Sequence, residues 1–242
     1  MSGAREVWDR WSSTHAVVAN GVPLFAFDGH QIVRTKSVGR SAPRQILCRH
    51  PAMDDLILRE TDRLVGDWQQ GGRCYDGLIY MMYRTDQDGR VTPLYIGKAE
   101  TLGKGSGNLS ANLVNLHRDR SKFARWGDNY AYHIGDLSAA VLPGHPPEKI
   151  NRKYQDWAST LFEQVQGEAR LRSPVFFWAK AWSPHDQGIW TDLSPTRLAF
   201  LEYLLIGVAS TAFGQILLNR EGNNRGGDFI RAAEGESETH AL

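Results

Sequence analysis

The apolar and polar positions of the first 72 residues alternate in short runs and then settle into a helical repeat. The short runs are rich in β-prone residues and lie at residues 23–27, 31–36 and 44–48. The helical repeat occupies residues 53–69, and its shared apolar face consists of Leu56, Ile57, Leu64 and Trp68. A shorter amphipathic helix is expected at residues 4–12. We interpret residues 1–72 as an N-terminal extension that packs on the rest of the chain.

Two strongly apolar runs after residue 76 predict a β-hairpin. The first run, GLIYMMYR, spans residues 77–84, and the second, VTPLYIG, spans residues 91–97. Asp88 and Gly89 lie between them, and an Asp-Gly pair is typical of the tight turns that join antiparallel strands. The hairpin is therefore the best-defined element of the chain.

The second half of the chain mixes helical and strand patterns. Leu109, Leu113 and Leu116 recur at helical spacing, and Phe123 and Trp126 extend that stripe. The other expected elements are a strand at residues 130–134, an amphipathic helix at 146–166, a strand at 175–182, a long apolar helix opened by Ser194 and Pro195 that runs to about Phe213, and a loop at 219–227. This order predicts an α+β fold with a small, mostly antiparallel β-sheet flanked by helices.

Composition places the chain among folded globular proteins. Of its 242 residues, 41% are hydrophobic and 23% are charged, and no apolar run reaches the ~18–20 residues of a membrane span. The first residues, MSGAREVWDRW, lack an apolar signal core, and Cys48 and Cys74 stand far apart. We expect reduced thiols and a cytoplasmic protein with no membrane partner. Residues 231–242 are acidic and are expected to be a disordered tail.

The net charge of +1 identifies no partner, but the charges are unevenly distributed. Between residues 29 and 53 there is no acidic side chain, whereas five basic ones occur: Arg34, Lys36, Arg40, Arg44 and Arg49. Such a run can pair with phosphates, so Arg34, Lys36, Arg40 and Arg44 are candidates for contacts with DNA. A solvated basic hairpin explains the same run equally well, and both interpretations stay open at this point.

Generic metal and nucleotide motifs do not fit the sequence. The segment GKAETLGKG has the wrong glycine spacing for a phosphate-binding loop, and neither HExxH nor CxxC occurs. His30, His117 and His133 are scattered without ligand spacing, and we expect His117 and His133 to be structural. What remains is the hairpin, which carries Tyr80 on one strand and Tyr95 on the next.

This hairpin resembles the signature of the GIY-YIG nuclease family. Ile79-Tyr80 keeps the last two letters of the first element, Tyr95-Ile96-Gly97 is the second element intact, and Lys98-Ala99 continues it as in many members. The family places a glutamate in a helix after its third strand, where Glu202 stands, and an asparagine beyond that helix, where Asn219 stands. The resemblance covers about residues 75–225 and implies a GIY-YIG nuclease-like domain at residues 73–230.

The resemblance also implies a chemical role for each of these residues. Glu202 would hold one Mg²⁺ or Mn²⁺, Tyr80 would activate the water with Tyr95 beside it, and Lys98 would add positive charge. An ordinary phenol pKa of ~10 must be lowered by nearby positive charge before the group is a useful base. The family's arginine has no match at the usual distance after the second element. Of Arg118, Arg120 and Arg125 we favour Arg125, then Arg118, because an unbroken helix would put these two on one face.

Each candidate also has a structural interpretation. The tyrosines can be cross-strand packing, Glu202 can lie on an exposed helix face, Asn219 can end a helix, and Lys98 can be solvated. The expected function is a metal-dependent DNA endonuclease of the restriction or defence kind. Cleavage of both strands would suggest a homodimer or sequential nicking. The alternative is a degenerate GIY-YIG-fold protein that binds nucleic acid without cutting it. A third class, a protein-interaction module, is favoured only by the near-neutral charge.

Overall fold

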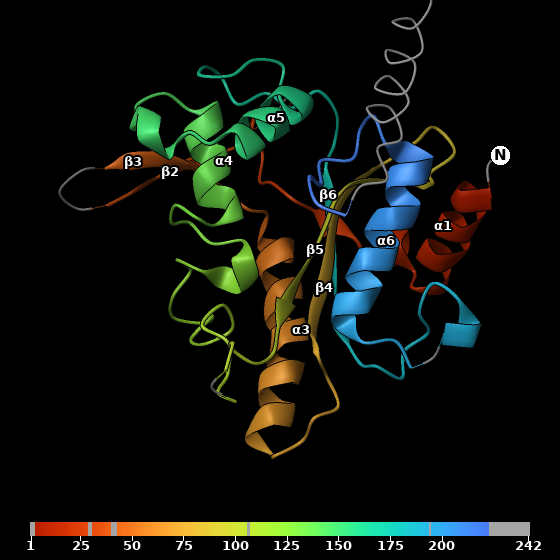
Figure 1. Ribbon diagram of the computed structural model, residues 1–242. Helices are drawn as coiled ribbons and strands as arrows, with labels where there is room; N and C mark the ends of the chain where they lie inside the picture. The colour runs from red at the N-terminus through yellow and green to blue at the C-terminus, as the bar shows by residue number, and fades with distance from the viewer. Residues whose placement is uncertain (1–2, 29–30, 40–42, 106, 194, 223–242) are drawn as a thin grey trace, which may run out of the picture.

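A computed structural model describes residues 3–28, 31–39, 43–105, 107–193 and 195–222 (Figure 1). Its main sheet has four antiparallel strands in the order β1 (Val22–Pro23), β6 (Phe176–Trp182), β4 (Gly77–Thr85) and β5 (Val91–Glu100). A separate antiparallel ribbon consists of β2 (Thr35–Val38) and β3 (Arg44–Leu47). The expected α+β class with a mostly antiparallel sheet is confirmed, and so is the hairpin, which is β4 and β5.

Helices cover both faces of the sheet. They are α1 (Gly3–Thr14), α2 (Val17–Asn20), α3 (Pro51–Gln69), α4 (His133–Val141), α5 (Arg152–Leu161) and α6 (Leu198–Phe213), with short 3₁₀ turns η1 (Phe123–Arg125), η2 (Pro147–Lys149) and η3 (Thr191–Leu193). Figure 1 shows α3, α4 and α5 on one side of the β4–β5 hairpin and α6 with α1 on the other. None of the helices in the described part of the chain is both long and apolar enough to cross a bilayer.

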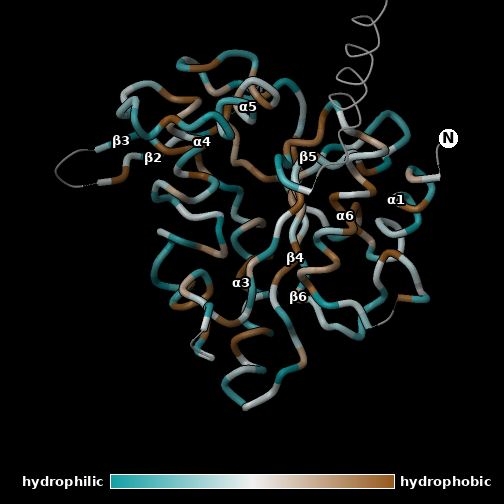
Figure 2. Tube along the Cα trace, viewed as in Figure 1, coloured by the Kyte–Doolittle hydropathy of each residue, from teal (hydrophilic) through white to brown (hydrophobic). Residues whose placement is uncertain are grey.

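The alternation of β4 explains this three-layer arrangement. Leu78, Tyr80 and Met82 join the core beneath α3, α4 and α5, whereas Ile79 and Met81 join the core beneath α1 and α6. Residues 77–83 are all buried, as expected of a central strand that is covered on both faces. In Figure 2 much of α6 is coloured hydrophobic, which matches a helix that packs on the sheet with one side and on α1 with another.

The N-terminal extension is built into the same fold. Val22 and Pro23 pair with Phe177 and Phe176, so β1 is an edge strand of the main sheet. Trp8 is fully buried, and its indole Nε1 donates to the carbonyl of Val91 at 3.0 Å. The helices expected at residues 4–12 and 53–69 are confirmed as α1 and α3.

Other expectations were wrong in detail. Trp68 is exposed, although it was expected on the buried face of α3. Ser194 lies outside the described residues, and α6 begins three residues after Pro195, at Leu198, where the Asp76 carboxylate accepts the backbone N–H. The helix expected at residues 146–166 is shorter, because Pro146 and Pro147 lead into a separate 3₁₀ turn before α5.

The largest departures fall between residues 109 and 134. Leu113 and Leu116 are buried as expected, but their segment is a series of turns and not a helix. The strand expected at residues 130–134 is absent, because Ala131 has a positive φ of 73° and its N–H is bound by the Asp136 side chain at 2.8 Å. That bond precedes α4, which begins at His133. The helix that would have aligned Arg118 with Arg125 does not exist.

Candidate active site

The register of the hairpin places the two phenols on one face of the sheet. Tyr80 lies opposite Gly97 and Met82 lies opposite Tyr95, and paired residues point to the same side. The rings of Tyr80 and Tyr95 are neighbours, with centroids 6.5 Å apart. The two tyrosines that the sequence places on adjacent strands are therefore also neighbours in space.

Gly97 is required because the ring of Tyr80 lies directly over it. A Cβ atom at position 97 would stand 2.7 Å from Cε2 and 2.8 Å from the hydroxyl oxygen of Tyr80, closer than real Cβ contacts come. The backbone of Gly97 does not have a positive φ, so the need is for space and not for unusual dihedrals. The glycine of the second element thus fixes where the Tyr80 hydroxyl points.

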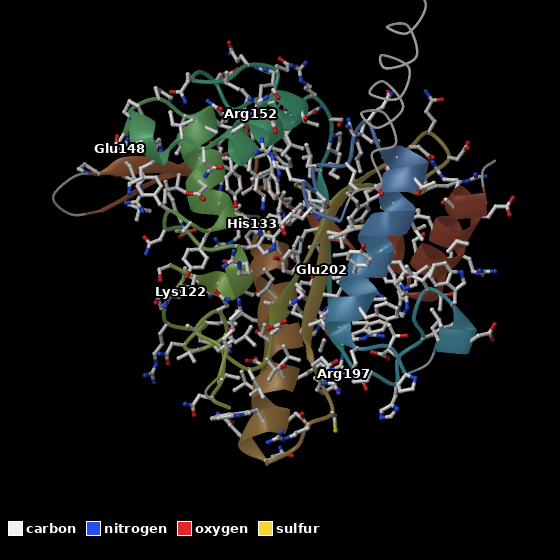
Figure 3. The ribbon with its side chains drawn as sticks, viewed as in Figure 1. Lys122, His133, Glu148, Arg152, Arg197 and Glu202 are labelled. Atoms are coloured by element: carbon white, nitrogen blue, oxygen red, sulfur yellow. The ribbon has the colours of Figure 1, made fainter. Side chains whose placement is uncertain are left out.

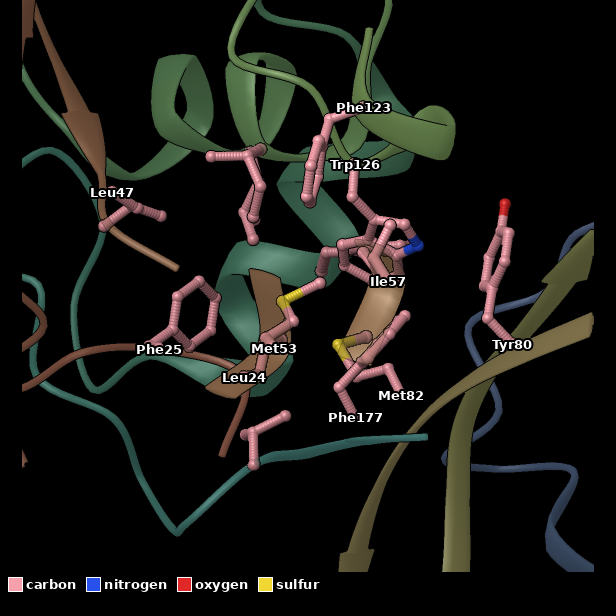
Figure 4. Packing of buried hydrophobic residues seen from close by; sticks show 14 of the residues in the cluster. Leu24, Phe25, Leu47, Met53, Ile57, Tyr80, Met82, Phe123, Trp126 and Phe177 are labelled. Atoms are coloured by element: carbon pink, nitrogen blue, oxygen red, sulfur yellow. The ribbon is translucent and has the colours of Figure 1, made fainter. Parts of the chain in front are cut away.

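Behind the tyrosines lies His133, which is buried and which sequence reasoning expected to be structural only. Its Nε2 is 3.3 Å from the Tyr80 hydroxyl, and its Nδ1 is 2.7 Å from the Tyr154 hydroxyl. The imidazole stacks on Trp157 with ring centroids 5.2 Å apart. Figure 3 shows His133 on α4 and Glu202 on α6, and Figure 4 shows Tyr80 rising from its strand beside Trp126. Only the folded chain brings these side chains together.

Burial controls the ionisation of this cluster. It lowers the pKa of His133 well below the ordinary value, with further lowering by the charges of Lys153 and Arg125. It raises the pKa of Tyr95 to about 12, and it raises that of Tyr80 well above its ordinary value. Arg125 opposes both of these increases but does not outweigh burial. Near pH 7 the imidazole and both phenols are therefore neutral, and the expected lowering of the phenol pKa is not provided by the protein's own charges.

Arg125 sits in an unusual backbone. Phe123, Ala124 and Arg125 have φ values of 32°, 49° and 75°, so three successive residues with side chains adopt left-handed conformations. Such strain is characteristic of functional segments that the surrounding structure holds in place. The guanidinium of Arg125 lies 5.7 Å from the centroid of the Tyr132 ring, and its charge acts on both phenols and on His133.

The two other arginine candidates are placed differently. Arg118 is exposed in the turns that replace the expected helix, and Arg120 lies over the Phe123 ring at 4.5 Å. Of the three, Arg125 is the one whose charge acts on the tyrosines in the described structure. The choice of Arg125 as the catalytic arginine stays a prediction, and the helix expected to align it with Arg118 is absent from this segment.

Lys153, near the start of α5, is a further member that sequence reasoning missed. Its Nζ donates to the Tyr95 hydroxyl at 3.3 Å and lies 4.6 Å from the centroid of the same ring. Burial, assisted by the charge of Arg125, lowers the pKa of Lys153 to about 8. This lysine is thus a cation at neutral pH that is close to losing its proton.

Glu202 and Lys98 face each other on the α6 side of β5. Lys98 lies opposite Ile79 in the register, and its Nζ is 4.0 Å from Glu202 Oε2. Lys98 also binds the carboxylate of Glu100. The Glu202 side chain is 23% exposed, and burial raises the pKa of its carboxyl, an increase that Lys98 opposes and that Glu100 and Glu221 reinforce. Glu202 is thus a partly desolvated carboxylate with a loose ion pair.

A pocket of about 360 Å³ joins the two sides of β5. Its lining includes Tyr95, Lys153, Glu202 and Asn219. Asn219 is buried and binds the backbone of Ile96 through both ends of its amide, donating at 2.8 Å and accepting at 3.0 Å. It therefore ties the segment after α6 to the edge of β5 and closes one wall of the pocket. The structure brings together Tyr95, Lys153 and Glu202 here, with Tyr80 and His133 buried behind Tyr95.

The basic run of the N-terminal extension is largely engaged within the protein. Arg34 pairs with Asp28 at 2.5 Å, Lys36 pairs with Asp128 at 2.7 Å, and Arg44 lies 4.7 Å from the centroid of the Tyr130 ring. Arg49 is buried in ion pairs with Asp54 and Asp128, which makes it a structural residue. Arg40 lies outside the described residues. Contacts with phosphate by Arg34, Lys36 or Arg44 would compete with these partners.

Two further observations bear on function. Within the described ranges, no group of three or more histidine, cysteine, aspartate or glutamate side chains is arranged to hold a metal ion. Glu202 alone nevertheless offers hard oxygen donors, is partly desolvated and borders an open pocket, which fits one divalent ion bound mainly by water and substrate. Comparisons of the chain with protein-family models, with curated proteins and with solved structures find no match.

Proposed function

We propose that the protein is a metal-dependent endonuclease of the GIY-YIG type that hydrolyses phosphodiester bonds in DNA. The observation that carries the proposal is the shared pocket of Tyr95, Lys153 and Glu202, with the hydrogen-bonded pair of Tyr80 and His133 behind it. A phosphodiester site needs a proton acceptor, positive charge for the phosphate and a carboxylate for a metal ion. The carboxylate and the positive charge meet at the edge of β5, and the proton acceptor lies behind Tyr95.

The proton acceptor is the buried relay from Tyr80 to His133. Because the imidazole is neutral, one ring nitrogen donates and the other accepts. When Nδ1 donates to the Tyr154 hydroxyl, Nε2 is free to accept the proton of Tyr80. The proton of the attacking water would then reach Tyr80 past Tyr95, and Tyr80 would pass its own proton to His133, which becomes an imidazolium. The raised pKa of Tyr80 suits this route, since the phenol never carries a full negative charge.

The positive charge comes from Lys153, which lines the pocket, and from Arg125, whose charge acts on both phenols. Lys153 and Arg125 can bind non-bridging phosphate oxygens, Arg125 through its planar fork. Glu202 would hold the Mg²⁺ or Mn²⁺, which supplies Lewis-acid stabilisation of the phosphate when bound. Lys98 faces Glu202 at 4.0 Å and opposes the increase that burial causes in its pKa. Asn219 acts as a positioning residue through its bonds to Ile96.

The order of residues along the chain supports the same proposal. Tyr80, Tyr95, Glu202 and Asn219 follow the succession of the GIY-YIG pattern, and the last three line one pocket. We include in the proposal a cytoplasmic restriction or defence role, with two copies acting when both DNA strands are cut. Cys48 and Cys74 are both free thiols, which fits a reducing compartment.

The experiment is cleavage of supercoiled plasmid with Mg²⁺ or Mn²⁺. We expect the wild type to nick or linearise the DNA and Glu202→Gln to lose at least about 10³-fold in rate, since a metal ion contributes several kcal/mol to the transition state. Glu148→Gln is the matched control, because Glu148 is an exposed carboxylate that lies outside the pocket of Glu202. Equal cleavage by wild type and Glu202→Gln would overturn the proposal.

One observation favours the alternative, a nucleic-acid-binding protein without cleavage. Tyr80 is only 2% exposed, so its hydroxyl meets the pocket through Tyr95 and not directly. In the same assay this alternative predicts DNA that is shifted in a gel but stays intact with either metal. A protein that neither shifts nor cuts the plasmid would instead favour an interaction module.

A further inference from the structure

A second pocket, of about 410 Å³, adjoins the candidate active site. Ala199 in the first turn of α6 lines both pockets, so they are neighbours along α6. The second pocket lies where β5 ends and α6 begins, and the last turn of α3 forms its other wall. Figure 3 shows Arg197 at the start of α6, below Glu202.

Trp68, an aromatic side chain that lines this pocket, is exposed, whereas its apolar neighbours on α3 are buried. Trp68 is 37% exposed, whereas Leu56, Ile57 and Leu64 of the same helix are buried. The other aromatic ring of the pocket, Tyr75, is half-buried, and the guanidinium of Arg63 lies 5.2 Å from its centroid. Trp68 is therefore the ring on which a planar group can stack.

The polar lining suits the edge of a base better than a phosphate. Asp76 pairs with Arg197 at 2.8 Å and caps α6 through the N–H of Leu198 at 3.0 Å. Asp67 accepts the N–H of Cys74 at 2.8 Å and keeps acceptor capacity for an amino group. These carboxylates would repel a phosphate inside the pocket, whereas the exposed guanidinium groups of Arg73 and Arg197 can meet the backbone at its rim.

The spacing along β5 fits a strand that runs through both pockets. Five residues separate Tyr95 in the first pocket from Glu100 in the second, which is roughly 17 Å of strand. A stacked DNA strand advances about 3.4 Å per nucleotide, so the pockets are about five stacked nucleotides apart, or fewer if the strand is extended.

We propose that this second pocket binds one unstacked nucleobase of the substrate strand, a few nucleotides from the bond that is cut. This subsite rests on the proposed nuclease function. Trp68 stacks on the base, Asp67 accepts from its exocyclic amino group, and Arg73 and Arg197 hold the adjoining backbone. Base-aromatic stacking tolerates any base, whereas the carboxylate favours cytosine or adenine.

Photocrosslinking tests the location. An oligodeoxynucleotide carrying 5-iododeoxycytidine at one position at a time is bound to Glu202→Gln and irradiated, and the attached residue is found by mass spectrometry. We expect attachment to Trp68 or Tyr75 from positions within about five nucleotides of the cut made by the wild type. Attachment only to residues outside this pocket would overturn the subsite.

Kinetics tests its contribution. Trp68→Ala should raise KM about tenfold or more on a long substrate and leave kcat unchanged. It should have no effect on a substrate too short to reach the pocket. Trp190→Ala is the matched control, because Trp190 is equally exposed but lines neither pocket. An unchanged KM on the long substrate would overturn the subsite.

The two proposals fail separately. Cleaved DNA without attachment at Trp68 or Tyr75 contradicts the subsite alone. Uncut DNA that is attached there contradicts the nuclease and keeps the base pocket.

Discussion

The polar groups on the two faces of β5 differ in burial and in charge. On the side of α4 and α5, the Tyr80 hydroxyl, the His133 imidazole and the Tyr154 hydroxyl are buried among aromatic rings and stay neutral. On the side of α6, Lys98 and Glu202 are charged groups at the protein surface, and each side chain is 23% exposed. Desolvation explains the contrast, because a buried group avoids charge unless it has a close partner.

The contrast separates two tasks that phosphodiester hydrolysis requires. The neutral side can take up a proton, which ends on His133 as a buried imidazolium, and the charged side can bind a cation where water completes its shell. Tyr95 and Lys153 lie where the two sides meet, since both line the pocket that also contains Glu202. Variants that act on only one side should therefore affect one task and spare the other.

The neutral side is tested most strongly by Tyr80→Phe and His133→Phe. If both groups belong to one relay, each variant should lower kcat by about 10²–10⁴-fold, the usual contribution of a general base. The double variant should lose little more than the single ones, because residues that act as a unit are not additive. Single-turnover cleavage at saturating DNA measures the effect.

Tyr154→Phe provides the internal control for that relay. Tyr154 binds the far nitrogen of His133, so we expect a smaller loss of about tenfold, from a less well-fixed tautomer. Binding of DNA by all four variants should stay near the wild-type value. Losses that simply multiply in the double variant would show that Tyr80 and His133 act independently.

The hairpin half of the site was predictable because its determinants are local. Alternation of period two places Tyr80 on a defined face, and the Asp-Gly turn fixes the approximate register. The Tyr80 ring lies so close to residue 97 that only glycine fits there, and this steric requirement is visible in the sequence as Gly97. The class of the fold followed from the same strand and helix patterns.

The other half was not predictable because its determinants are distant contacts. His133 stands in a segment that read as a strand, and it joins the site through α4, 53 residues after Tyr80. Lys153 lies in an expected amphipathic helix whose charged positions all look alike in sequence. Phe123, Ala124 and Arg125 have positive φ values, but none of them is a glycine, so the sequence gives no sign of this left-handed backbone. Tertiary packing overrides local pattern at all three positions.

Gly97→Ala tests how the hairpin supports the neutral side. The added Cβ must displace the Tyr80 ring, and such overpacking costs about 1–3 kcal/mol in the free energy of unfolding. Gly66→Ala is the control, because a Cβ there meets nothing within 4 Å inside α3 and should stabilise by about 0.5–1 kcal/mol. Urea unfolding measures both changes. A Gly97→Ala protein as stable as the wild type would contradict the required close contact.

The smallest effect is expected at Lys153, where the two sides meet, and it should depend on pH. The pKa of about 8 means that the cation is present below pH 8 and lost above it, so kcat/KM should fall about tenfold as pH rises from 7 to 9. Lys153→Arg, which stays charged, should remove this fall, whereas Lys153→Met should be slow at both pH values.

The stability of Lys153→Met tests the lowered pKa of Lys153 independently of catalysis. The folded pKa lies below the unfolded value of about 10.4, so between these two values the unfolded chain binds more protons and wild-type stability rises with pH. Lys153→Met should therefore be more stable than the wild type at pH 7, and this advantage should shrink as pH increases above 8. A difference in unfolding free energy that stays constant from pH 7 to 10 would mean that Lys153 is not desolvated beside Tyr95. Lys153 would then not link the neutral face of β5 to the charged face.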